Sequence, residues 1–553
     1  MGERRLVVVS NRLPIVLERR KTGEWNIGPG AGGLITALGP VLRNRGGLWI
    51  GWLGTVSEKL ADFSGLDELL QRGAEETGYA LRPVHLSSEE VHNFYFGFSN
   101  QILWPLFHDF PTRCNFDPAY WQAYEWVNRK FVQAILDNTT EEDFVWVHDY
   151  QLILAGSELI KLRRKRHTGF FLHIPFPPLD VFINLPWRFA ILDALMQYDL
   201  IGFQTERDRR NFIGCVRSLT RRVRVLGKGH VCKLVTSDRE VRVGSFPISI
   251  DFKDFAGLSA NLETAEQAEM IRANLPNRKL IFGVDRLDYT KGIPNRLNAL
   301  VNALERYPDL RRRITLIQVI VPSREVIEEY GRIKREIERI IGEINGRYTE
   351  VGWTPITYIF GSLSRPELVG YYQACEIALI TPLKDGMNLV AKEYCASKID
   401  EDGALILSEF AGAAASLHNG ALLVNPYDIE GVADAIYQAY IMSPNERRER
   451  MRKLRHSIRI NDVYRWVASF LEAGIAEDIR QFPLMELFVP RRRQDFLPKQ
   501  SPKRVFRLDP NRAVHLQLSA QPGRNAAFLK KRVRALFRDI RAEPWNPLRR
   551  FIL

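Results

Sequence analysis

Two carboxylates, Asp385 and Glu393, occur in the stretch 381–393, which reads Thr-Pro-Leu-Lys-Asp-Gly-Met-Asn-Leu-Val-Ala-Lys-Glu. The apolar run 377–380 predicts a strand before them, and the turn at 386–388 predicts the start of a helix. Free backbone N–H groups at a helix N-terminus can bind a diphosphate or sugar hydroxyls. Glu393 could accept hydrogen bonds from the two vicinal hydroxyls of a ribose. The pattern indicates a nucleotide-sugar site; alternatively, Asp385 only caps the helix and Glu393 lies in solvent.

Two cations, Arg286 and Lys291, lie in the sequence Val-Asp-Arg-Leu-Asp-Tyr-Thr-Lys-Gly, directly after a predicted strand. Breaking the bond between a sugar and its nucleotide leaves extra negative charge on the diphosphate, and positioned cations stabilise this charge without protonation. Both side chains are therefore candidates for holding a diphosphate leaving group. The alternative is that they form surface ion pairs with Asp285 and Asp288.

A glycine-rich turn, Gly-Pro-Gly-Ala-Gly-Gly-Leu at 28–34, precedes a predicted helix at 35–42. Gly32 and Gly33 could bring backbone N–H groups against a phosphate. The spacing is not the G-x-G-x-x-G of dinucleotide enzymes, so a turn needed only for tight packing is the other interpretation.

A second set of residues could recognise a substrate that carries its own phosphate. Arg12 and Arg324 each follow a predicted strand, and two arginines suit a dianion. Tyr95 and Trp104 lie in an aromatic stretch and could equally belong to the core.

Asp149 and His173 each close an apolar strand, where a buried polar group needs a reason. A capping aspartate and a hydrogen-bonded core histidine are the structural alternatives. The sequence shows no nucleophile with a paired base, no Ser-His-Asp order and no metal-ligand cluster.

The elements that position these residues are strands that alternate with helices. Short apolar runs predict two series of strands, at 6–10, 48–51, 144–147, 169–173 and 200–203, and then at 280–284, 314–321, 357–360, 377–380, 404–407 and 421–424. This alternation predicts an α/β fold of two tandem doubly wound, Rossmann-like domains facing across a cleft. Ligands bind beyond the carboxyl ends of the strands in such sheets, which is where the candidate residues fall.

The change of series sets the expected domains. We expect an N-terminal Rossmann-like acceptor domain at 1–250, a C-terminal Rossmann-like nucleotide-sugar domain at 251–460, a helix at 461–485 that crosses back to the first domain, and a basic extension at 486–553. After Arg324, apolar residues at helical spacing predict one buried helix face: Val326, Tyr330, Ile333, Ile337, Ile340 and Ile344.

The composition is ordinary for a globular protein, with 45% hydrophobic and 11% aromatic residues in 553. No apolar run is long enough to predict a membrane span, and the first residues do not resemble a signal peptide. Five scattered cysteines without C-x-x-C spacing indicate neither a disulfide framework nor a zinc site, so we expect a cytoplasmic protein.

The net charge of +13 is concentrated at the C-terminal end. From Leu484 onward there are seventeen Lys or Arg and five Asp or Glu, so this tail holds +12 of the total and the rest is near neutral. The tail ends in a predicted basic amphipathic helix at 526–541. We expect this helix to dock on its own protein or a sister subunit; contact with a membrane or a nucleic acid is the alternative.

Seven motifs in one order, between about residue 5 and residue 480, resemble the trehalose-6-phosphate synthase family. They are Val-Ser-Asn-Arg-Leu-Pro, Ala-Gly-Gly-Leu, Leu-Trp-Pro-Leu-Phe-His, Val-His-Asp-Tyr, Phe-Leu-His-Ile-Pro-Phe-Pro, Arg-Leu-Asp-Tyr-Thr-Lys-Gly and Asp-Gly-Met-Asn-Leu-Val-Ala-Lys-Glu. The tail beyond 485 is not covered.

The resemblance implies a retaining glycosyltransferase of the GT-B fold that moves glucose from UDP-glucose to C1 of glucose 6-phosphate, with no required metal or other cofactor. The acceptor-site positions of the family match Arg12, Tyr95, Trp104, Asp149 and Arg324. The donor-site positions match Gly32, Gly33, His173, Arg286, Lys291, Leu363, Asp385, Gly386, Met387, Asn388, Leu389, Val390, Ala391, Lys392 and Glu393. Leu363 stands where the family commonly has a phenylalanine near the base, which bears on the choice among UDP, ADP and GDP.

Members of this family are thought to react on one face of the sugar, with the leaving phosphate taking the acceptor's proton. The residues expected to take part in catalysis are Asp149, His173, Arg286, Lys291 and Asp385. No Asp-x-Asp-x-Thr phosphatase signature is present, so a separate trehalose-6-phosphate phosphatase is an expected pathway partner. We also expect a homo-oligomer that does not bind nucleic acid.

Two other functions remain open from the sequence. The related glucosylglycerol-phosphate synthases share the donor half but use ADP-glucose and glycerol 3-phosphate. A non-catalytic sugar-phosphate sensor on the same fold would be expected to lose charged pocket positions, and none is lost here.

Overall fold

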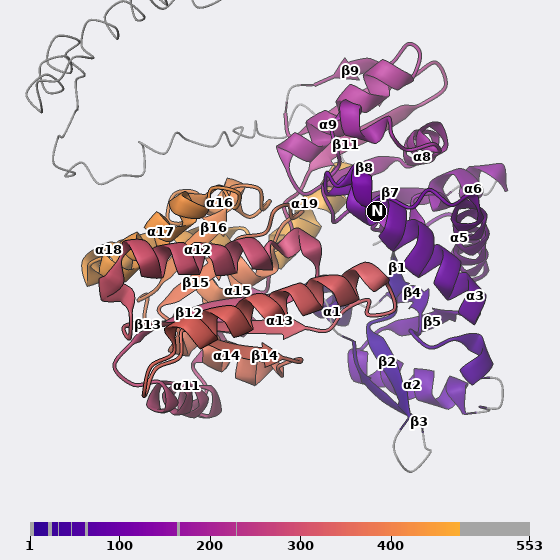
Figure 1. Cartoon of the computed structure of the whole chain (residues 1–553). Helices are drawn as coiled ribbons and strands as arrows, with labels where there is room; N and C mark the ends of the chain where they lie inside the picture. The colour runs from indigo at the N-terminus through magenta and orange to yellow at the C-terminus, as the bar shows by residue number, and fades with distance from the viewer. Residues whose placement is uncertain are drawn as a thin grey trace, which may run out of the picture. The chain divides into compact units, whose positions relative to one another are not determined.

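The computed structural model describes residues 5–475 apart from 20–24, 31–32, 46, 61–62, 64, 163–165 and 228. The predicted basic extension at 486–553 and its helix at 526–541 lie outside the described residues. Two large sheets dominate the described part (Figure 1), and both belong to one unit, Met1–Pro490.

The first sheet has the strand order β5-β4-β1-β6-β7-β8-β11-β10-β9. Its strands are parallel from β5 to β11, whereas β10 runs antiparallel to both of its neighbours. Val7 of β1 pairs with Leu48 on one side and with Val145 on the other. The strands are β1 Leu6–Arg12, β4 Leu48–Trp52, β5 Ala80–Val84, β6 Phe144–His148, β7 His167–Leu172, β8 Leu200–Phe203, β9 Arg224–Leu226, β10 Val231–Val235 and β11 Glu240–Ser245.

The second sheet has the order β14-β13-β12-β15-β16-β17, and all its strands are parallel. Its strands are β12 Lys279–Arg286, β13 Ile314–Val321, β14 Ile356–Phe360, β15 Ile377–Ile380, β16 Ala404–Ser408 and β17 Leu422–Val424. A separate antiparallel hairpin joins β2 Ile15–Arg19 to β3 Trp25–Pro29.

Six strands of each sheet share one topology. Starting from the edge strand β5, the first six strands of the first sheet have the order 3-2-1-4-5-6 when they are numbered along the chain. The second sheet has the same order, starting from β14. This is the order of a dinucleotide-binding Rossmann sheet, with a switch point between strands 1 and 4. The switch points are β1/β6 and β12/β15, and the predicted fold class of two doubly wound α/β sheets is confirmed.

The central strands of the sheets are buried on both faces, which explains their continuous apolar sequences. In β1, Val7 and Val9 belong to one hydrophobic core, whereas Leu6 and Val8 belong to the other. Alternate side chains of a strand point to opposite faces, so a strand covered on both sides must be apolar at every position.

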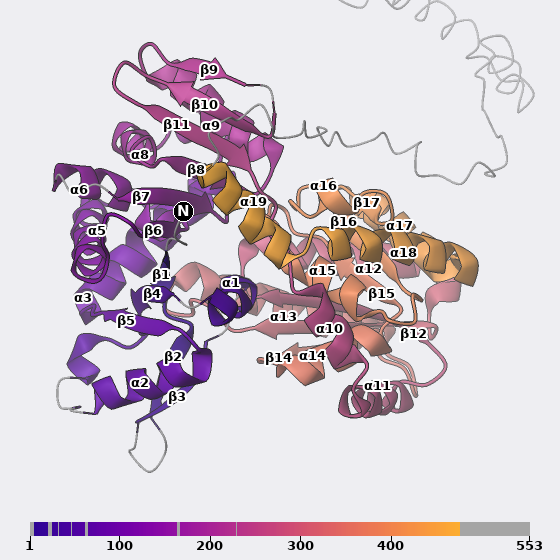
Figure 2. The same cartoon turned by 180° about the vertical axis from the view of Figure 1, so that it is seen from behind.

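Helices fill the connections and cover these faces (Figures 1 and 2). Capping residues mark where helices begin. The side chain of Asp117 accepts a hydrogen bond from the Ala119 N–H at the start of the helix that begins at Pro118, and Ser364 forms a capping box with Glu367 at the helix that begins at Arg365. The α-helices are α1 Gly33–Arg45, α2 Leu66–Thr77, α3 Ser88–Glu90, α4 Trp104–Phe107, α5 Pro118–Asn138, α6 Ala155–Lys161, α7 Leu179–Phe182, α8 Arg188–Leu195, α9 Glu206–Leu219, α10 Phe252–Ser259, α11 Leu262–Asn274, α12 Ile293–Arg306, α13 Glu328–Tyr348, α14 Arg365–Ala374, α15 Leu389–Ser397, α16 Ala414–Leu417, α17 Ile429–Ile441, α18 Pro444–Ile460 and α19 Val463–Ile475. A π-helix, Val91–Leu103, precedes α4.

The buried face predicted after Arg324 is present in α13 from Tyr330 to Ile344. The prediction is wrong for Val326, which precedes the helix and is 71% exposed. None of the helices in the described residues is both long and apolar enough to cross a membrane.

The last described helix, α19, returns to the first sheet, where it contacts β8 and β11 (Figure 2). Phe470 stacks on Trp146 of β6 with ring centroids 4.3 Å apart. At the start of α19, the Val463 N–H donates to the carbonyl oxygen of Ile250 at 3.1 Å. The chain passes from the first sheet to the second near Ile250 and returns near Val463, so this hydrogen bond joins the two connecting segments.

Candidate active site

Four charged residues follow the four strands at the two switch points. Arg12 ends β1 and Asp149 follows β6, while Arg286 ends β12 and Asp385 follows β15. The switch point of an open α/β sheet is its ligand-binding position. Both sheets therefore present predicted site residues where a ligand is expected.

Asp385 forms an ion pair with Lys291 at 2.6 Å, and both side chains are mostly buried. The Asn388 amide also donates to Asp385 at 3.2 Å. Burial raises the pKa of the Asp385 carboxyl, but the charge and hydrogen bond of Lys291 outweigh it and hold the pKa below its usual value. The residue that caps α15 is Asn388, whose side chain accepts the Ala391 N–H, so capping is not the role of Asp385.

Glu393 is partly buried, and its carboxylate accepts a hydrogen bond from the Tyr372 hydroxyl at 2.8 Å. Burial raises its pKa. The alternative of a solvated glutamate therefore does not hold. Leu363, predicted to lie near the base, packs partly buried against the core of the second sheet.

The predicted donor residues between Gly386 and Lys392 do not all face one way. A Cβ on Gly386 would overlap the His173 carbonyl oxygen, so this turn lies directly against the end of β7. Lys392 is 3% exposed and donates its Nζ to the Ile248 carbonyl at 2.6 Å. Burial lowers the pKa of Lys392 to about 7. Its ammonium is therefore engaged with the segment between the sheets, and only its backbone is available to a ligand. Among the other predicted donor residues, Met387 and Ala391 are buried, while Leu389 and Val390 are partly buried.

Trp104 carries two arginines on its ring. The Arg324 guanidinium lies 4.1 Å from the ring centroid, and that of Arg286 lies 5.5 Å away. Arg324 also donates to Asp288 at 3.3 Å and to the hydroxyls of Tyr330 at 2.7 Å and Tyr150 at 3.3 Å. Arg324 thus joins the second sheet to the end of β6 in the first.

Arg12 is exposed and lies over the ring of Trp52 at 4.5 Å and that of Tyr95 at 5.9 Å. Burial raises the pKa of Tyr95, but the positive charges of Arg324, Arg12 and Arg286 bring it below its usual value. The ring contacts place Arg12 over Tyr95, and Arg286 and Arg324 over Trp104. The predicted acceptor residues from both sheets therefore form one positively charged cluster.

Asp149 has a left-handed backbone, with φ 75°, which is uncommon for a residue other than glycine. Its carboxylate accepts the His173 backbone N–H at 3.1 Å. Burial raises the pKa of Asp149 to about 6, against the lowering effect of the Tyr150 and His173 N–H groups and of Arg286 and Arg324. Strained backbone of this kind is often found at functional sites.

His173 forms a chain of side-chain contacts with two neighbours. Its Nε2 lies 3.1 Å from Nδ1 of His148, and its Nδ1 lies 3.3 Å from the Gln204 amide nitrogen. Burial lowers the pKa of His173 to about 3 and holds that of His148 well below its usual value. Both imidazoles are therefore neutral.

The sequence reasoning missed His108 and Asp288. His108 is buried, stacks on Trp104 at 4.2 Å and contacts the Trp104 carbonyl at 2.7 Å. Its spacing of four residues from Trp104, within the quoted Leu-Trp-Pro-Leu-Phe-His motif, was the available signal. Asp288, treated as a surface partner, is 2% exposed and binds Arg324.

Gly32 lies outside the described residues, and Gly33 begins α1. The phosphate-binding role of both glycines stays a prediction. No group of three or more His, Cys, Asp or Glu side chains that could hold a metal occurs within the part of the chain that the structure describes.

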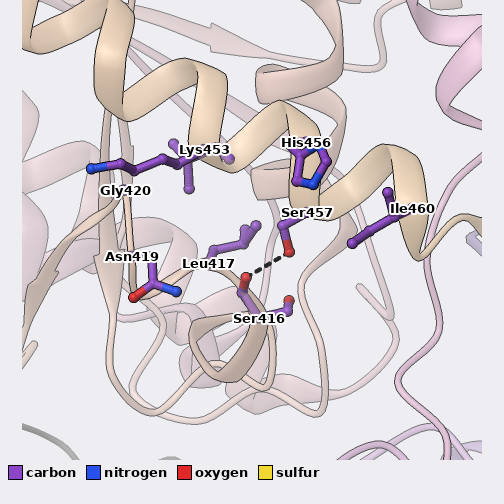
Figure 3. Close-up of a pocket in the computed structure, with 9 residues that line it drawn as sticks. Ser416, Leu417, Asn419, Gly420, Lys453, His456, Ser457 and Ile460 are labelled. Carbon is purple, nitrogen blue, oxygen red and sulfur yellow. Dashed lines mark hydrogen bonds between the residues drawn. The ribbon is translucent and has the colours of Figure 1, made fainter.

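A separate pocket of about 420 Å³ lies between α18 and the segment from α16 to β17 (Figure 3). The Ser457 hydroxyl donates to the Ser416 carbonyl at 2.9 Å in its wall. None of the predicted site residues lines this pocket. The pocket is lined instead by Ser416, Leu417, Asn419, Gly420, Lys453, Leu454, His456, Ser457 and Ile460.

The fold and site define a protein of the GT-B class, in which two Rossmann-like sheets direct their switch points to one site rich in cations. The sequence model of glycosyltransferase family 20 matches residues 4–474. The chain therefore belongs to glycosyltransferase family 20, and it is a glycosyltransferase.

Similar proteins agree with this assignment. Trehalose-6-phosphate synthase of Mycolicibacterium smegmatis is 44% identical over 479 residues, which cover 85% of this chain and 92% of that protein. A UDP-forming α,α-trehalose-phosphate synthase from Burkholderia xenovorans, in complex with glucose-6-phosphate, has a TM-score of 0.76 and 33% identity, covering 85% of this chain and 99% of the other. A structure from E. coli described as trehalose-6-phosphate bound with UDP-2-fluoro glucose has a TM-score of 0.75 and 35% identity, with 85% and 99% covered. The family resemblance seen in the sequence is confirmed.

Proposed function

We propose that this protein moves glucose from UDP-glucose to glucose 6-phosphate with retention of configuration, and that it releases α,α-trehalose 6-phosphate and UDP. The observation that carries the proposal is the convergence of Arg12, Arg286 and Arg324 on Tyr95 and Trp104, next to the Lys291–Asp385 pair. Relatives with these activities, and solved relatives holding a sugar phosphate or a UDP-sugar analogue, support it.

The donor half uses the residues that follow β12 and β15. Arg286 and Lys291 are assigned to the diphosphate, because cations held in place stabilise the charge that develops on a leaving phosphate. Asp385 holds Lys291 in position through their 2.6 Å ion pair. Glu393 is assigned to the ribose hydroxyls, and the turn at Gly386 to the glucose.

The acceptor half uses the positively charged cluster. Arg12 and Arg324 are assigned to the phosphate of glucose 6-phosphate, since planar guanidinium groups bind phosphate oxygens in pairs. Arg12 is exposed and stacked and forms no ion pair with another described residue, so no such pair has to break when it binds a phosphate. Tyr95 and Trp104 provide the rings that hold both arginines.

The chemical step follows from the protonation states. His173 is neutral and engaged at both ring nitrogens, so it does not serve as a base. We assign removal of the acceptor's proton to the leaving phosphate, on the same face of the sugar. Asp149, ionised above pH 6, stabilises positive charge on the sugar and orients the acceptor.

We further propose a cytoplasmic homo-oligomer that works with a separate phosphatase. The five described cysteines are all free thiols, which suits a reducing compartment. We expect the tail beyond 485 to assist assembly. A chain ending at residue 485 lacks 68 of the 553 residues, so its light-scattering mass is divided by the mass of the shortened subunit. We expect fewer subunits per particle than in the full-length protein, and an unchanged number of subunits would refute the role of the tail.

The test is product formation by the purified protein, read by mass spectrometry. UDP-, ADP- and GDP-glucose are each combined with glucose 6-phosphate and with glycerol 3-phosphate. We expect a disaccharide phosphate from UDP-glucose and glucose 6-phosphate. Turnover only with glycerol 3-phosphate would instead assign a glucosylglycerol-phosphate synthase, and no turnover with any pair would favour a sensor.

A further inference from the structure

We propose that Gln204 is a positioning residue that sets the tautomer of His173 and so holds the end of β7 against the donor turn. Gln204 follows β8 and is 2% exposed. Its tautomer-setting role depends only on geometry, whereas its effect on turnover rests on the function proposed above.

The orientation of the Gln204 amide is fixed by the backbone. Its Oε1 accepts the Ile248 N–H at 2.9 Å. A backbone N–H can only donate, so the group facing it must be the amide oxygen. The amide nitrogen therefore faces Nδ1 of His173, at 3.3 Å.

This orientation decides the tautomer of His173. An amide NH₂ group donates and does not accept, so Nδ1 of His173 must be the unprotonated nitrogen. In a neutral imidazole the proton then lies on Nε2, which donates to Nδ1 of His148 at 3.1 Å. All hydrogen bonds from Ile248 through Gln204 and His173 to His148 therefore run in one direction.

Aromatic rings surround His148, the last residue in this series of hydrogen bonds. Nε2 of His148 is buried with no hydrogen-bond partner among the described residues. Trp146 lies 4.7 Å from the His148 ring centroid, and Trp466 of α19 lies 6.4 Å away. No described group at the His148 end fixes which ring nitrogens are protonated, so Gln204, at the other end, determines it.

The same residue, Ile248, is also held from the donor side. Gln204 binds the N–H of Ile248, and Lys392 of α15 binds its carbonyl at 2.6 Å. His173, at the other end of the Gln204 contact, donates its backbone N–H to Asp149 and packs its carbonyl against Gly386. Gln204 thus connects the donor helix, through Ile248 and His173, with Asp149 and Gly386, which the proposed function places at the transferred glucose.

The test is Gln204→Glu, in which one carboxylate oxygen can still accept the Ile248 N–H. The other oxygen cannot donate, so an ionised carboxylate demands a proton on Nδ1 of His173. Long-range proton–nitrogen NMR spectra of full-length protein with ¹⁵N-labelled histidine, recorded at pH 8, report which ring nitrogen is protonated. His173→Gln identifies the signals.

We expect Nδ1 of His173 to be unprotonated in the natural protein and protonated in Gln204→Glu. Turnover should fall about 10- to 100-fold with little change in KM for either substrate, since a small misplacement of reacting groups costs about that much. The matched control is Gln197→Glu, which adds the same charge at a residue that binds Arg239 at 3.0 Å. It should leave both the tautomer and turnover unchanged.

A proton on Nδ1 in the natural protein, or an unprotonated Nδ1 in Gln204→Glu, would refute the tautomer assignment. A changed tautomer with unchanged turnover would refute the positioning role. Should Gln204→Glu not fold, Gln204→Met serves instead, and both tautomers of His173 are expected; a single unchanged tautomer would refute the proposal. Absence of turnover in the natural protein would count against the proposed function alone, because the NMR result does not depend on it.

Discussion

Lys291 and Asp385 show how much a residue pattern could predict about this site. Both were expected at strand ends because of their charge, and the structure joins them at 2.6 Å. The interactions of Lys392 and Gln204 could not be predicted, because each depends on the distant Ile248 backbone rather than on a local pattern. Local spacing identifies strand-end charges, whereas contacts between distant segments need the fold.

Lys291→Ala should reduce turnover by about 100- to 1,000-fold, the loss typical of removing one group that stabilises a developing negative charge. The reason is that Lys291 is assigned to the leaving diphosphate. Steady-state kinetics with UDP-glucose and glucose 6-phosphate measure this effect. Lys453→Ala, which removes an ion pair with Glu449 on α18, is the control. A raised KM with unchanged turnover would mean that Lys291 only binds the ground state.

Arg12→Lys keeps the charge but loses the planar fork that binds two phosphate oxygens. We expect KM for glucose 6-phosphate to rise about 10-fold or more, because charge-assisted hydrogen bonds contribute about 1.5–3 kcal/mol each. KM for UDP-glucose should not change. Initial rates with each substrate varied in turn would show the difference, and equal rises in both constants would contradict the assignment of Arg12 to the acceptor.

Asp149→Asn should stabilise the protein while it abolishes most activity. The folded pKa of Asp149, about 6, lies above the value of an exposed aspartate, so the native state binds the proton more tightly than the unfolded state. Asp149 therefore costs stability above pH 6, and this cost disappears as the pH falls toward 4. Asparagine also tolerates φ 75° better than most residues.

The expected gain for Asp149→Asn at pH 7 is on the order of 2 kcal/mol in the free energy of unfolding. Denaturant unfolding of both proteins at pH 7 and pH 4 measures it, with the difference shrinking at the lower pH. A gain that is independent of pH would assign the effect to backbone strain rather than to the charge.

At the scale of elements, the sequence predicted the central parallel strands of both sheets and missed β5, at one end of the first sheet, and β9, β10 and β11 at the other end. Central strands such as β1 are apolar throughout because helices cover both faces. The edge strand β5 contains Pro83 and two exposed residues, and β9 is exposed along its length. Proline and exposed side chains are tolerated at an edge, where one side of the ladder is unpaired, so the apolar signal is lost there.

Helix α19 contributes stability through Phe470, whose ring lies against Trp146 and directly above Gly169 and Gly202. Phe470→Ala should lower the free energy of unfolding by about 3–5 kcal/mol, the usual cost of removing a buried phenylalanine. Guanidinium unfolding measures the change, and Glu472→Ala, on the exposed side of the same helix, is the control. A small loss would show that α19 is only loosely docked.

At the scale of the whole molecule, the site is built from both sheets. Arg12 comes from the first, whereas Lys291 and Arg324 come from the second, and Arg324 reaches Tyr150 at 3.3 Å. The sequence predicted two domains meeting at 250, and this boundary remains a prediction. What it could not predict was which residues would meet across the sheets, because the relative placement of two sheets depends on their packing.

Each substrate should therefore stabilise the whole molecule through its own half. UDP or glucose 6-phosphate at 100 times its Kd should add about 2.7 kcal/mol to the free energy of unfolding. We expect Arg12→Lys to reduce the effect of the sugar phosphate alone, and Lys291→Ala to reduce the effect of UDP alone. Thermal melts with each ligand measure both effects, and a loss of both responses in either variant would contradict the separate assignments.

The bond between Val463 and Ile250 has a mechanical consequence. The chain passes between the two sheets twice, and the hydroxyl of Tyr464 also donates to Asp251 at 3.0 Å, so both passages are fastened at one point. A single connecting segment lets two domains rotate about several axes. Two connecting segments bonded to each other act as a hinge and restrict the rotation to one axis. This hinge is at Ile250, two residues from Ile248, so a rotation of the two sheets would occur next to the residue that Gln204 and Lys392 bind.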